Sequence, residues 1–303
     1  MNLKRREFLR CSALAAGALA LGAPPFNVAE TRPGTFDPFG KVTLGQSKLQ
    51  TSRFCLGTGM KAWQRQSNHI SLGKEKLEAL IRGAYDRGAR LFDLADLYGT
   101  HPYVLPALRG IPRDRFQVIT KIWWRKDGGV PERDQGDADV CVARFLRELN
   151  TDYLDLVLLH CVTSAKWPEE LRKQMDLLSK LKETGTIRAH GVSCHSLEAL
   201  EAAAAEPWVD SVHTRINPEG IKMDGPPEKV VPVLQKIHAA GKGVVGMKII
   251  GEGAFRNSEE KRDASVKFVL GLGCVDVLNV GCESPAEIDD FAARVRKVTV
   301  AKA

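Results

Sequence analysis

The segments YLDLVLLH (residues 153–160), PEELRKQMDLLSKLKETG (168–185) and IRAHGVS (187–193) decide the fold of this chain. The first and third are short apolar runs, which are typical of buried strands. The middle segment has apolar residues at helical spacing and closes with Gly185, a residue that suits the end of a helix. A strand, a helix and a second strand in this order predict a βαβ unit with parallel strands.

The same alternation continues on both sides of this unit. Further strand-like runs are FCLGTG (54–59), ARLFD (89–93), FQVIT (116–120), SVHTRI (211–216), GVVGMKI (243–249) and VDVLNV (275–280), and helical patterns lie between them. Eight strand–helix pairs in about 260 residues predict an α/β fold, a (β/α)8 TIM barrel, with an N-terminal β-hairpin near residue 41. A doubly wound sheet is the alternative, but no G-x-G-x-x-G motif opens a helix after the first strand.

The first residues have the pattern of an export signal. KRREFLR (4–10) precedes the apolar stretch CSALAAGALALGA (11–23), which is too short to span a bilayer as a helix. Adjacent Arg5 and Arg6, together with Phe8 and Leu9, resemble a twin-arginine signal. We therefore expect a signal peptide at 1–29, a linker at 30–41, a barrel at 42–298 and a tail at 299–303. An amphipathic N-terminal helix or tail anchor is the alternative.

That signal implies export through the twin-arginine machinery, to the bacterial periplasm. The route carries folded proteins, often with cofactor already bound, and no stable membrane association is expected after cleavage near Ala23 or Ala29. Composition is that of a globular protein, with 44% apolar residues and a net charge of +7, part of which lies in the signal. No later run of Lys and Arg is interleaved with aromatic residues, so we expect no nucleic-acid binding. The cysteines form no C-x-x-C pair, so no metal site is expected.

Ionisable residues stand where successive strands end. Asp93 ends the second barrel strand, Lys121 follows the third and His160 ends the fourth, while Tyr98 lies in the loop after the second. In a TIM barrel, the catalytic residues lie at the carboxyl ends of the strands. These four side chains are therefore expected at one mouth.

Several motifs in order make the chain similar to the aldo-keto reductase family over roughly residues 42–298. They are LFDLADLYG (91–99), TKIW (120–123), LNTDYLDLVLLH (149–160) and LLSKLKETGTIRAHGVS (177–193). The resemblance implies an NAD(P)-dependent oxidoreductase that reduces an aldehyde or ketone to an alcohol, or the reverse. Tyr98 would be the general acid, with Lys121 and Asp93 as its pKa partners and His160 orienting the substrate.

The chemistry explains that grouping. A phenol with a pKa near 10 is a weak acid at neutral pH, and a neighbouring ammonium lowers its pKa. A buried Lys121 needs a counter-ion, which Asp93 supplies. His160 would stabilise negative charge that develops on the carbonyl oxygen. Asp96, in the same motif, is assigned only a local structural role.

The resemblance also implies a set of cofactor-binding residues, in which several positions depart from the family pattern. Ser193 is kept, Cys194 stands for Asn, His213 for Gln and Met247 for a stacking Tyr. These departures leave open a second hypothesis, a barrel with weakened catalysis that binds a ligand or partner. The implied cofactor residues are Gly57, Thr58, Ser193, Cys194, His213, Met247, Gly251, Gly253, Gly281 and Cys282.

Two tryptophans and an acidic segment bear on specificity. Trp123 and Trp124 would form an aromatic wall that favours a flat apolar carbonyl substrate, although Trp124 can equally be a core residue. Residues 280–290 (VGCESPAEIDD), which hold the adenosine 2′-phosphate in the family, contain four acids and no Lys or Arg. NADP(H) preference is therefore doubtful. The acids also suit the start of a helix, and Lys248 or Arg256 could reach the phosphate.

The export signal makes a first prediction. Replacing both Arg5 and Arg6 by Lys keeps the charge of the segment but removes the arginine pair, so the precursor should stay in the cytoplasm. The measurement is fractionation followed by immunoblotting. Replacing Lys4 by Arg is the control and should leave export intact. Unchanged periplasmic delivery of the double variant would mean that the pair is an ordinary basic segment.

Overall fold

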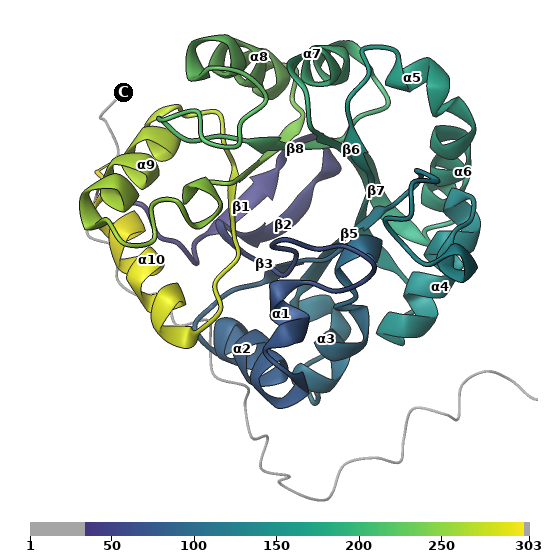
Figure 1. Ribbon diagram of the computed structural model, residues 1–303, viewed down its shortest axis with the longest axis horizontal. Coiled ribbons are helices and arrows are strands. Elements are labelled where there is room, and N and C mark those ends of the chain that lie inside the picture. Colours follow the sequence, from purple (N-terminus) through teal and green to yellow (C-terminus); the bar gives the residue numbers. More distant parts are fainter. Residues whose placement is uncertain (1–33, 300–303) are drawn as a thin grey trace, which may run out of the picture.

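The computed structural model describes residues 34–299, which form a closed barrel of eight parallel strands ringed by helices (Figure 1). Around the barrel the strands follow the order β10-β3-β4-β5-β6-β7-β8-β9. This arrangement confirms the predicted (β/α)8 TIM barrel. The strands are β3 (Phe54–Gly57), β4 (Leu91–Asp93), β5 (Gln117–Ile122), β6 (Leu154–Val162), β7 (Ile187–Cys194), β8 (Ser211–Arg215), β9 (Gly243–Met247) and β10 (Val277–Val280).

Each strand is followed by at least one helix, and together the helices cover the outside of the barrel. Sequence patterns missed α3, because Pro102 and Pro106 argue against a helix. Pro102 lies in the first turn, where proline is tolerated, and the helix buries Val104 and Ala107. The helices are α1 (Asn68–Ser71), α2 (Lys74–Asp86), α3 (His101–Ala107), α4 (Ala138–Leu149), α5 (Trp167–Glu170), α6 (Arg172–Glu183), α7 (Leu197–Ala205), α8 (Pro227–Ala239), α9 (Glu259–Gly271) and α10 (Pro285–Lys297).

The predicted hairpin closes the amino-terminal end of the barrel. β1 (Lys41–Leu44) pairs antiparallel with β2 (Leu49–Ser52), and Leu44 and Leu49 pack into one apolar cluster with inward-facing strand residues. At the turn, the backbone N–H of Gln46 donates to the carbonyl of Gly241, 2.6 Å away. The hairpin therefore keeps water from the lower interior and leaves only the opposite end open.

Alternation along the strands sorts apolar from polar residues inside the barrel. Cys55, Leu91, Ile119, Leu158, Val245 and Val277 belong to the interior apolar cluster. Because side chains two apart on a strand share a face, the next inward position on each of these strands lies at the mouth. Those positions are Gly57, Asp93, Lys121, His160, Met247 and Asn279. The polar groups of the interior are thus concentrated at one end.

The two ends of the described chain lie against each other. Thr35 pairs with Thr299, and the N–H of Phe36 donates to the carbonyl of Val298 at 3.2 Å. The described part of the predicted linker is thus attached to the barrel. The predicted signal peptide lies outside the described residues. Within residues 34–299, no helix combines the length and the apolar character needed to cross a membrane.

Candidate active site

A buried lysine joins the predicted catalytic residues. Lys121 Nζ donates to the carboxylate of Asp93, to the carbonyl of Leu94 at 3.0 Å and to the hydroxyl of Tyr98 at 3.3 Å. Lys121 is fully buried on β5, and Asp93 ends the neighbouring strand β4. The ammonium therefore has three oxygen partners, which satisfy all of its donors.

Asp93 is held in its ionised form from two further strands. Burial favours the neutral acid, but Lys121 and His213 outweigh it and keep the pKa of Asp93 well below its ordinary value. Asn279 Nδ2 on β10 donates to the second carboxylate oxygen at 2.8 Å, and His213 Nε2 lies 3.4 Å from the first. Sequence reasoning missed Asn279, although its inward-facing position near the end of a strand would have been a signal.

Tyr98 lies on a 3-10 turn, η2 (Asp96–Tyr98), with its ring against the backbone of Gly59. A Cβ at Gly59 would lie 2.1 Å from the ring carbon Cζ of Tyr98, so no larger residue fits there. Burial, followed by the charge of Asp93, raises the pKa of Tyr98 well above its ordinary value. In the chain by itself, burial and the charge of Asp93 therefore outweigh the lowering of this pKa that was expected from Lys121. The phenol is held protonated.

His160 completes the group. Its ring meets that of Tyr98 edge-on, with 5.6 Å between centroids, and that of Trp123 at 5.4 Å. Burial and the charge of Lys121 lower the pKa of His160 well below its ordinary value, so the imidazole is neutral. Trp124 Nε1 donates to the backbone carbonyl of His160 at 2.8 Å. Trp123 thus lies against His160, while Trp124 supports the strand end.

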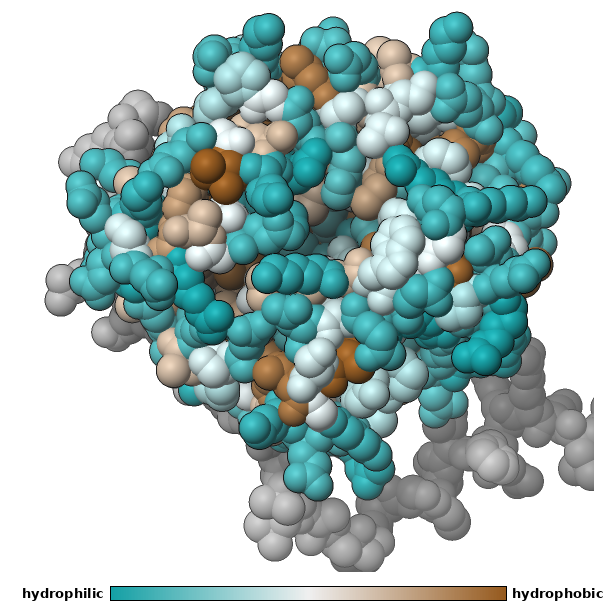
Figure 2. All heavy atoms as spheres, in the orientation of Figure 1, coloured by the Kyte–Doolittle hydropathy of each residue, from teal (hydrophilic) through white to brown (hydrophobic). Residues whose placement is uncertain are grey.

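A cavity of about 500 Å³ leads from this group along the loop after β9 to the start of α10. In the same view as Figure 1, Figure 2 shows hydrophilic side chains dominating this face around a hollowed centre. Among the expected cofactor residues, those that line the cavity are Gly57, Met247, Gly253, Gly281 and Cys282. Lining residues that sequence reasoning missed include Gly59, Met60, Asn279, Arg262 and Phe291.

The other expected cofactor residues lie elsewhere. Thr58 is buried, with its hydroxyl 2.8 Å from that of Thr100, and Gly251 is buried in the turn after β9. Ser193 faces the interior, where its hydroxyl has no hydrogen-bond partner. Cys194 is a correction, because its thiol donates to the carbonyl of Ala199 in the outer core, 3.7 Å away. Strand alternation places neighbouring side chains on opposite faces.

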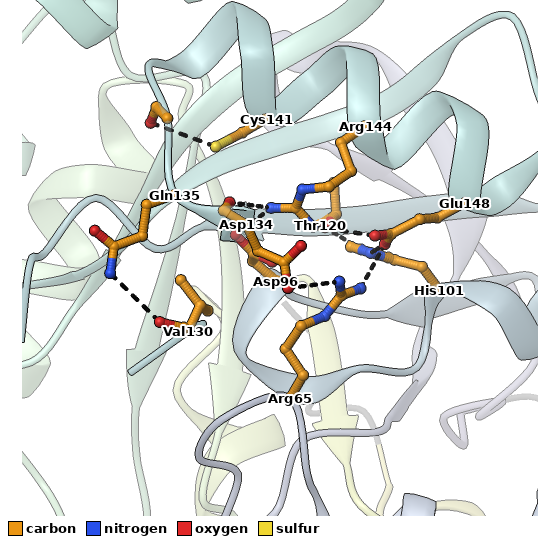
Figure 3. Close-up of polar contacts among 11 residues, drawn as sticks. Arg65, Asp96, His101, Thr120, Val130, Asp134, Gln135, Cys141, Arg144 and Glu148 are labelled. Atoms are coloured by element: carbon orange, nitrogen blue, oxygen red, sulfur yellow. Dashed lines mark hydrogen bonds and ion pairs between the residues drawn. The ribbon is translucent and has the colours of Figure 1, made fainter. Parts of the chain in front are cut away.

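A buried charge network supports the turn that carries Tyr98 (Figure 3). Asp96 is fully buried and accepts from Arg144 Nη2 of α4 at 2.8 Å. The same nitrogen donates to the carbonyl of Asp134 at 2.8 Å, and Arg144 Nη1 donates to Glu148 at 3.1 Å. The local structural role expected for Asp96 is therefore to bind α4.

Glu148 connects this network to two more segments (Figure 3). It accepts from Arg65 Nη2 at 2.7 Å, in the loop after β3. It also lies 2.8 Å from His101 Nδ1, while His101 Nε2 lies 2.7 Å from the hydroxyl of Thr120, the neighbour of Lys121. Burial opposes ionisation, but His101 and Arg65 lower the pKa of Glu148 to about 2. The carboxylate of Glu148 thus connects the loop after β3, through Arg65, with α3 and β5, through His101 and Thr120.

A closed parallel barrel with ionisable side chains at the carboxyl ends of its strands defines a TIM-barrel enzyme. The model of the Aldo/keto reductase family matches residues 55–282, three quarters of the chain. The chain therefore belongs to the aldo/keto reductase family.

Known proteins agree with this assignment. The chain is 27% identical over 220 residues to a probable aldo-keto reductase from Glycine max, covering 71% of this chain and 60% of that protein. It is 29% identical over 146 residues to a methylglyoxal reductase from Salmonella typhimurium, covering 45% of this chain and 49% of that one. Less than two thirds of either relative is spanned. An aldo-keto reductase from Klebsiella pneumoniae in complex with NADPH has a similar fold, with a TM-score of 0.63, 20% identity and coverage of 86% and 91%.

The network around Glu148 makes a second prediction. Glu148→Gln should lower the free energy of unfolding at pH 7 by about 3 kcal/mol, because the pKa falls from 4.5 to about 2 on folding. A depressed folded-state pKa contributes stability above the unfolded pKa and loses it as the pH falls. The difference between variant and wild type should therefore shrink from pH 5 to pH 2.

Urea unfolding at pH 7, 5 and 3 measures this difference. Glu201→Gln, an exposed position of α7, is the matched control and should change little at any pH. A deficit for Glu148→Gln that is the same at pH 7 and pH 3 would show that the ionised carboxylate is not what stabilises the fold.

Proposed function

We propose that this chain reduces an aldehyde or ketone to an alcohol, or catalyses the reverse oxidation, with a nicotinamide cofactor. One observation carries the proposal: Lys121 bonds to both Asp93 and Tyr98 at a mouth that opens into a cavity of about 500 Å³. A protonated phenol beside a long cavity suits proton delivery to a bound carbonyl group.

The cavity fits a dinucleotide. Gly57, Gly59, Gly253 and Gly281 line it, so the backbone can approach a ligand closely. Gly253 has a φ of +94°, a conformation that favours glycine. The cofactor would supply the hydride that reaches the carbonyl carbon. Among the expected residues, Gly57, Met247, Gly253, Gly281 and Cys282 would hold it.

Residues of this chain supply the proton that the carbonyl oxygen receives. Tyr98 donates its hydroxyl proton to the carbonyl oxygen as that oxygen becomes negative, leaving a phenolate that Lys121 stabilises 3.3 Å away. Two electrons and one proton reach the substrate as hydride, and Tyr98 gives the second proton, so the carbonyl becomes an alcohol. His160, neutral and with its ring 5.6 Å from that of Tyr98, orients the oxygen.

The substrate class follows from the relatives in part. The Salmonella typhimurium relative is a methylglyoxal reductase, which supports a small carbonyl compound as substrate. The pattern at the amino terminus, KRREFLR before a short apolar stretch, supports export through the twin-arginine machinery to the periplasm.

The cofactor preference depends on two arginines that enter the cavity from outside the acidic segment. Arg256 Nη2 donates to Glu287 at 2.5 Å and to Glu283 at 3.2 Å, and Arg262 lies 3.4 Å from Asp290. The two arginines that could bind a 2′-phosphate are therefore already paired with carboxylates of the acidic segment. We therefore propose that NADP(H) preference is absent.

The acid role of Tyr98 makes a third prediction. Tyr98→Phe removes the proton donor but keeps the ring on Gly59, so kcat should fall at least about 100-fold while the affinity for cofactor changes little. Steady-state kinetics and fluorescence titration with NADH measure the two quantities. Lys121→Met should also reduce kcat and move the pH profile. If Tyr98→Phe keeps most of the wild-type kcat, another group is the acid.

The acidic segment makes a fourth prediction. NADH should bind as tightly as NADPH or more tightly, and Glu287→Gln should shift the ratio of dissociation constants towards NADPH by releasing Arg256. Glu260→Gln, at the exposed start of α9, is the control and should leave that ratio unchanged. Wild-type NADPH binding at least tenfold tighter than NADH would refute the proposed preference. If neither NADH nor NADPH bound at millimolar concentration, the proposed oxidoreductase activity would be refuted.

A further inference from the structure

Arg125 lies beside the mouth, and not all N–H donors of its guanidinium have hydrogen-bond partners. It follows Trp124 and is half-buried, and its Nη2 donates to the carbonyl of Cys161 at 2.5 Å and to the hydroxyl of Thr163 at 3.1 Å. Its Nε is buried without a hydrogen-bond partner. Among residues 34–299, no carboxylate forms an ion pair with it. A guanidinium presents five donors in a fork that matches a carboxylate, so this one is incompletely satisfied.

The position of Arg125 is set by an irregular strand end. The register between β6 and β7 shifts after Leu159, and Cys161 has a φ of +56°, which is uncommon for a residue other than glycine. This bulge directs the carbonyl of Cys161 to Arg125 and brings its thiol 3.4 Å from His195 Nε2. Cys161, whose carbonyl accepts from Arg125, directly follows His160 in this irregular segment, so Arg125 is held close to His160.

Two other cations at this edge of the mouth are already paired. Arg215 forms an ion pair with Asp224 and donates to the carbonyl of His195 at 3.1 Å. Lys248 forms an ion pair with Glu252 at 2.8 Å. Arg125 has no acidic partner among the described residues, and it is half-buried, unlike its exposed and equally unpaired neighbour Lys126.

Neither neighbouring side chain supplies a negative charge. Burial raises the pKa of Cys161 to about 11, so its thiol is neutral at physiological pH. Burial, followed by Arg215, lowers the pKa of His195 to about 3, so its imidazole is neutral as well. The guanidinium of Arg125, which lies 5.8 Å from the ring of Trp123 and 5.3 Å from that of Trp124, is thus open to an anionic ligand.

An aromatic wall lies between this cation and the loop after β3. Trp63 is 48% exposed, and its ring meets that of Trp123 edge-on at 6.1 Å. Leu97 and Val130 pack with Trp123 in a cluster that Tyr98 and Cys161 also contact. The guanidinium of Arg125 lies 5.8 Å from the ring of Trp123. An apolar surface thus connects the proton donor to the cation.

We infer that Arg125 binds the carboxylate of a substrate that carries both a reactive carbonyl group and an acid, with Trp63 and Trp123 packing against its apolar part. This inference rests on the proposed function for the identity of the reacting group. It adds the substrate class, an aldehyde or ketone acid, and assigns the acid to Arg125.

The test compares two aldehydes that differ only in charge, 4-carboxybenzaldehyde and its methyl ester. Wild-type protein should favour the acid in kcat/KM, and Arg125→Gln should lower the acid-to-ester ratio at least about tenfold, mainly through KM. Arg125→Lys should restore part of it, since Lys keeps the charge but not the fork. Lys236→Gln, exposed in the last turn of α8, removes the same charge elsewhere and should leave the ratio unchanged.

A binding measurement separates this inference from the proposed function. Calorimetric titration of the cofactor-free protein with benzoate should give a dissociation constant at least about tenfold smaller for wild type than for Arg125→Gln, with benzamide binding equally to both. An unchanged acid-to-ester ratio, or benzoate binding that does not depend on Arg125, would overturn the inference and leave carbonyl reduction standing. Benzoate binding that depends on Arg125 without turnover of either aldehyde would support the acid site and count against the proposed function.

Discussion

The buried ion pair between Lys121 and Asp93 is the constraint on which the rest of the site depends. Removing two charges from water costs several kcal/mol for each ion, and their attraction offsets this cost only if the remaining donors and acceptors also find partners. The carbonyl of Leu94 and the hydroxyl of Tyr98 accept the remaining hydrogen bonds of the Lys121 ammonium. Asn279 donates a hydrogen bond to the carboxylate of Asp93. Four segments must therefore meet at one point, and the barrel is the structure that brings them there.

The barrel supplies this meeting point because its interior is divided by depth. Apolar side chains fill the lower layers, and Leu44 and Leu49 of the hairpin close the bottom. At the mouth, side chains of opposite charge and hydrogen-bonding groups replace them. Outside the barrel, the ion pair of Asp96 with Arg144 holds the turn that carries Tyr98 against α4. The position of Tyr98 thus depends on two buried charge pairs: Lys121 with Asp93, which bonds to its hydroxyl, and Arg144 with Asp96, which holds its turn.

The two sides of the mouth differ in charge. On the side of α10, Glu283 and Glu287 neutralise Arg256. On the side of the bulge in β6, Arg125 is without an acidic partner among the described residues. Tyr98 lies between them, beside the cavity on one side and the aromatic cluster on the other. A cofactor and a substrate would approach the same phenol from environments of different polarity, which favours a fixed orientation of each.

The sequence by itself determined the barrel and the position of the predicted catalytic residues at one mouth. Alternation with period two places Asp93, Lys121 and His160 at the inward-facing ends of successive strands, and this follows from local geometry alone. The same rule, applied to Ser193, would have shown that Cys194 faces outward. Only the tertiary structure decided the partners that come from distant segments, such as Gly59 under Tyr98, Asn279 on Asp93 and Arg144 on Asp96. It also decided the protonation of Tyr98, because the pKa of a phenol depends on burial and on the sum of the surrounding charges, and neither is a local property of the chain.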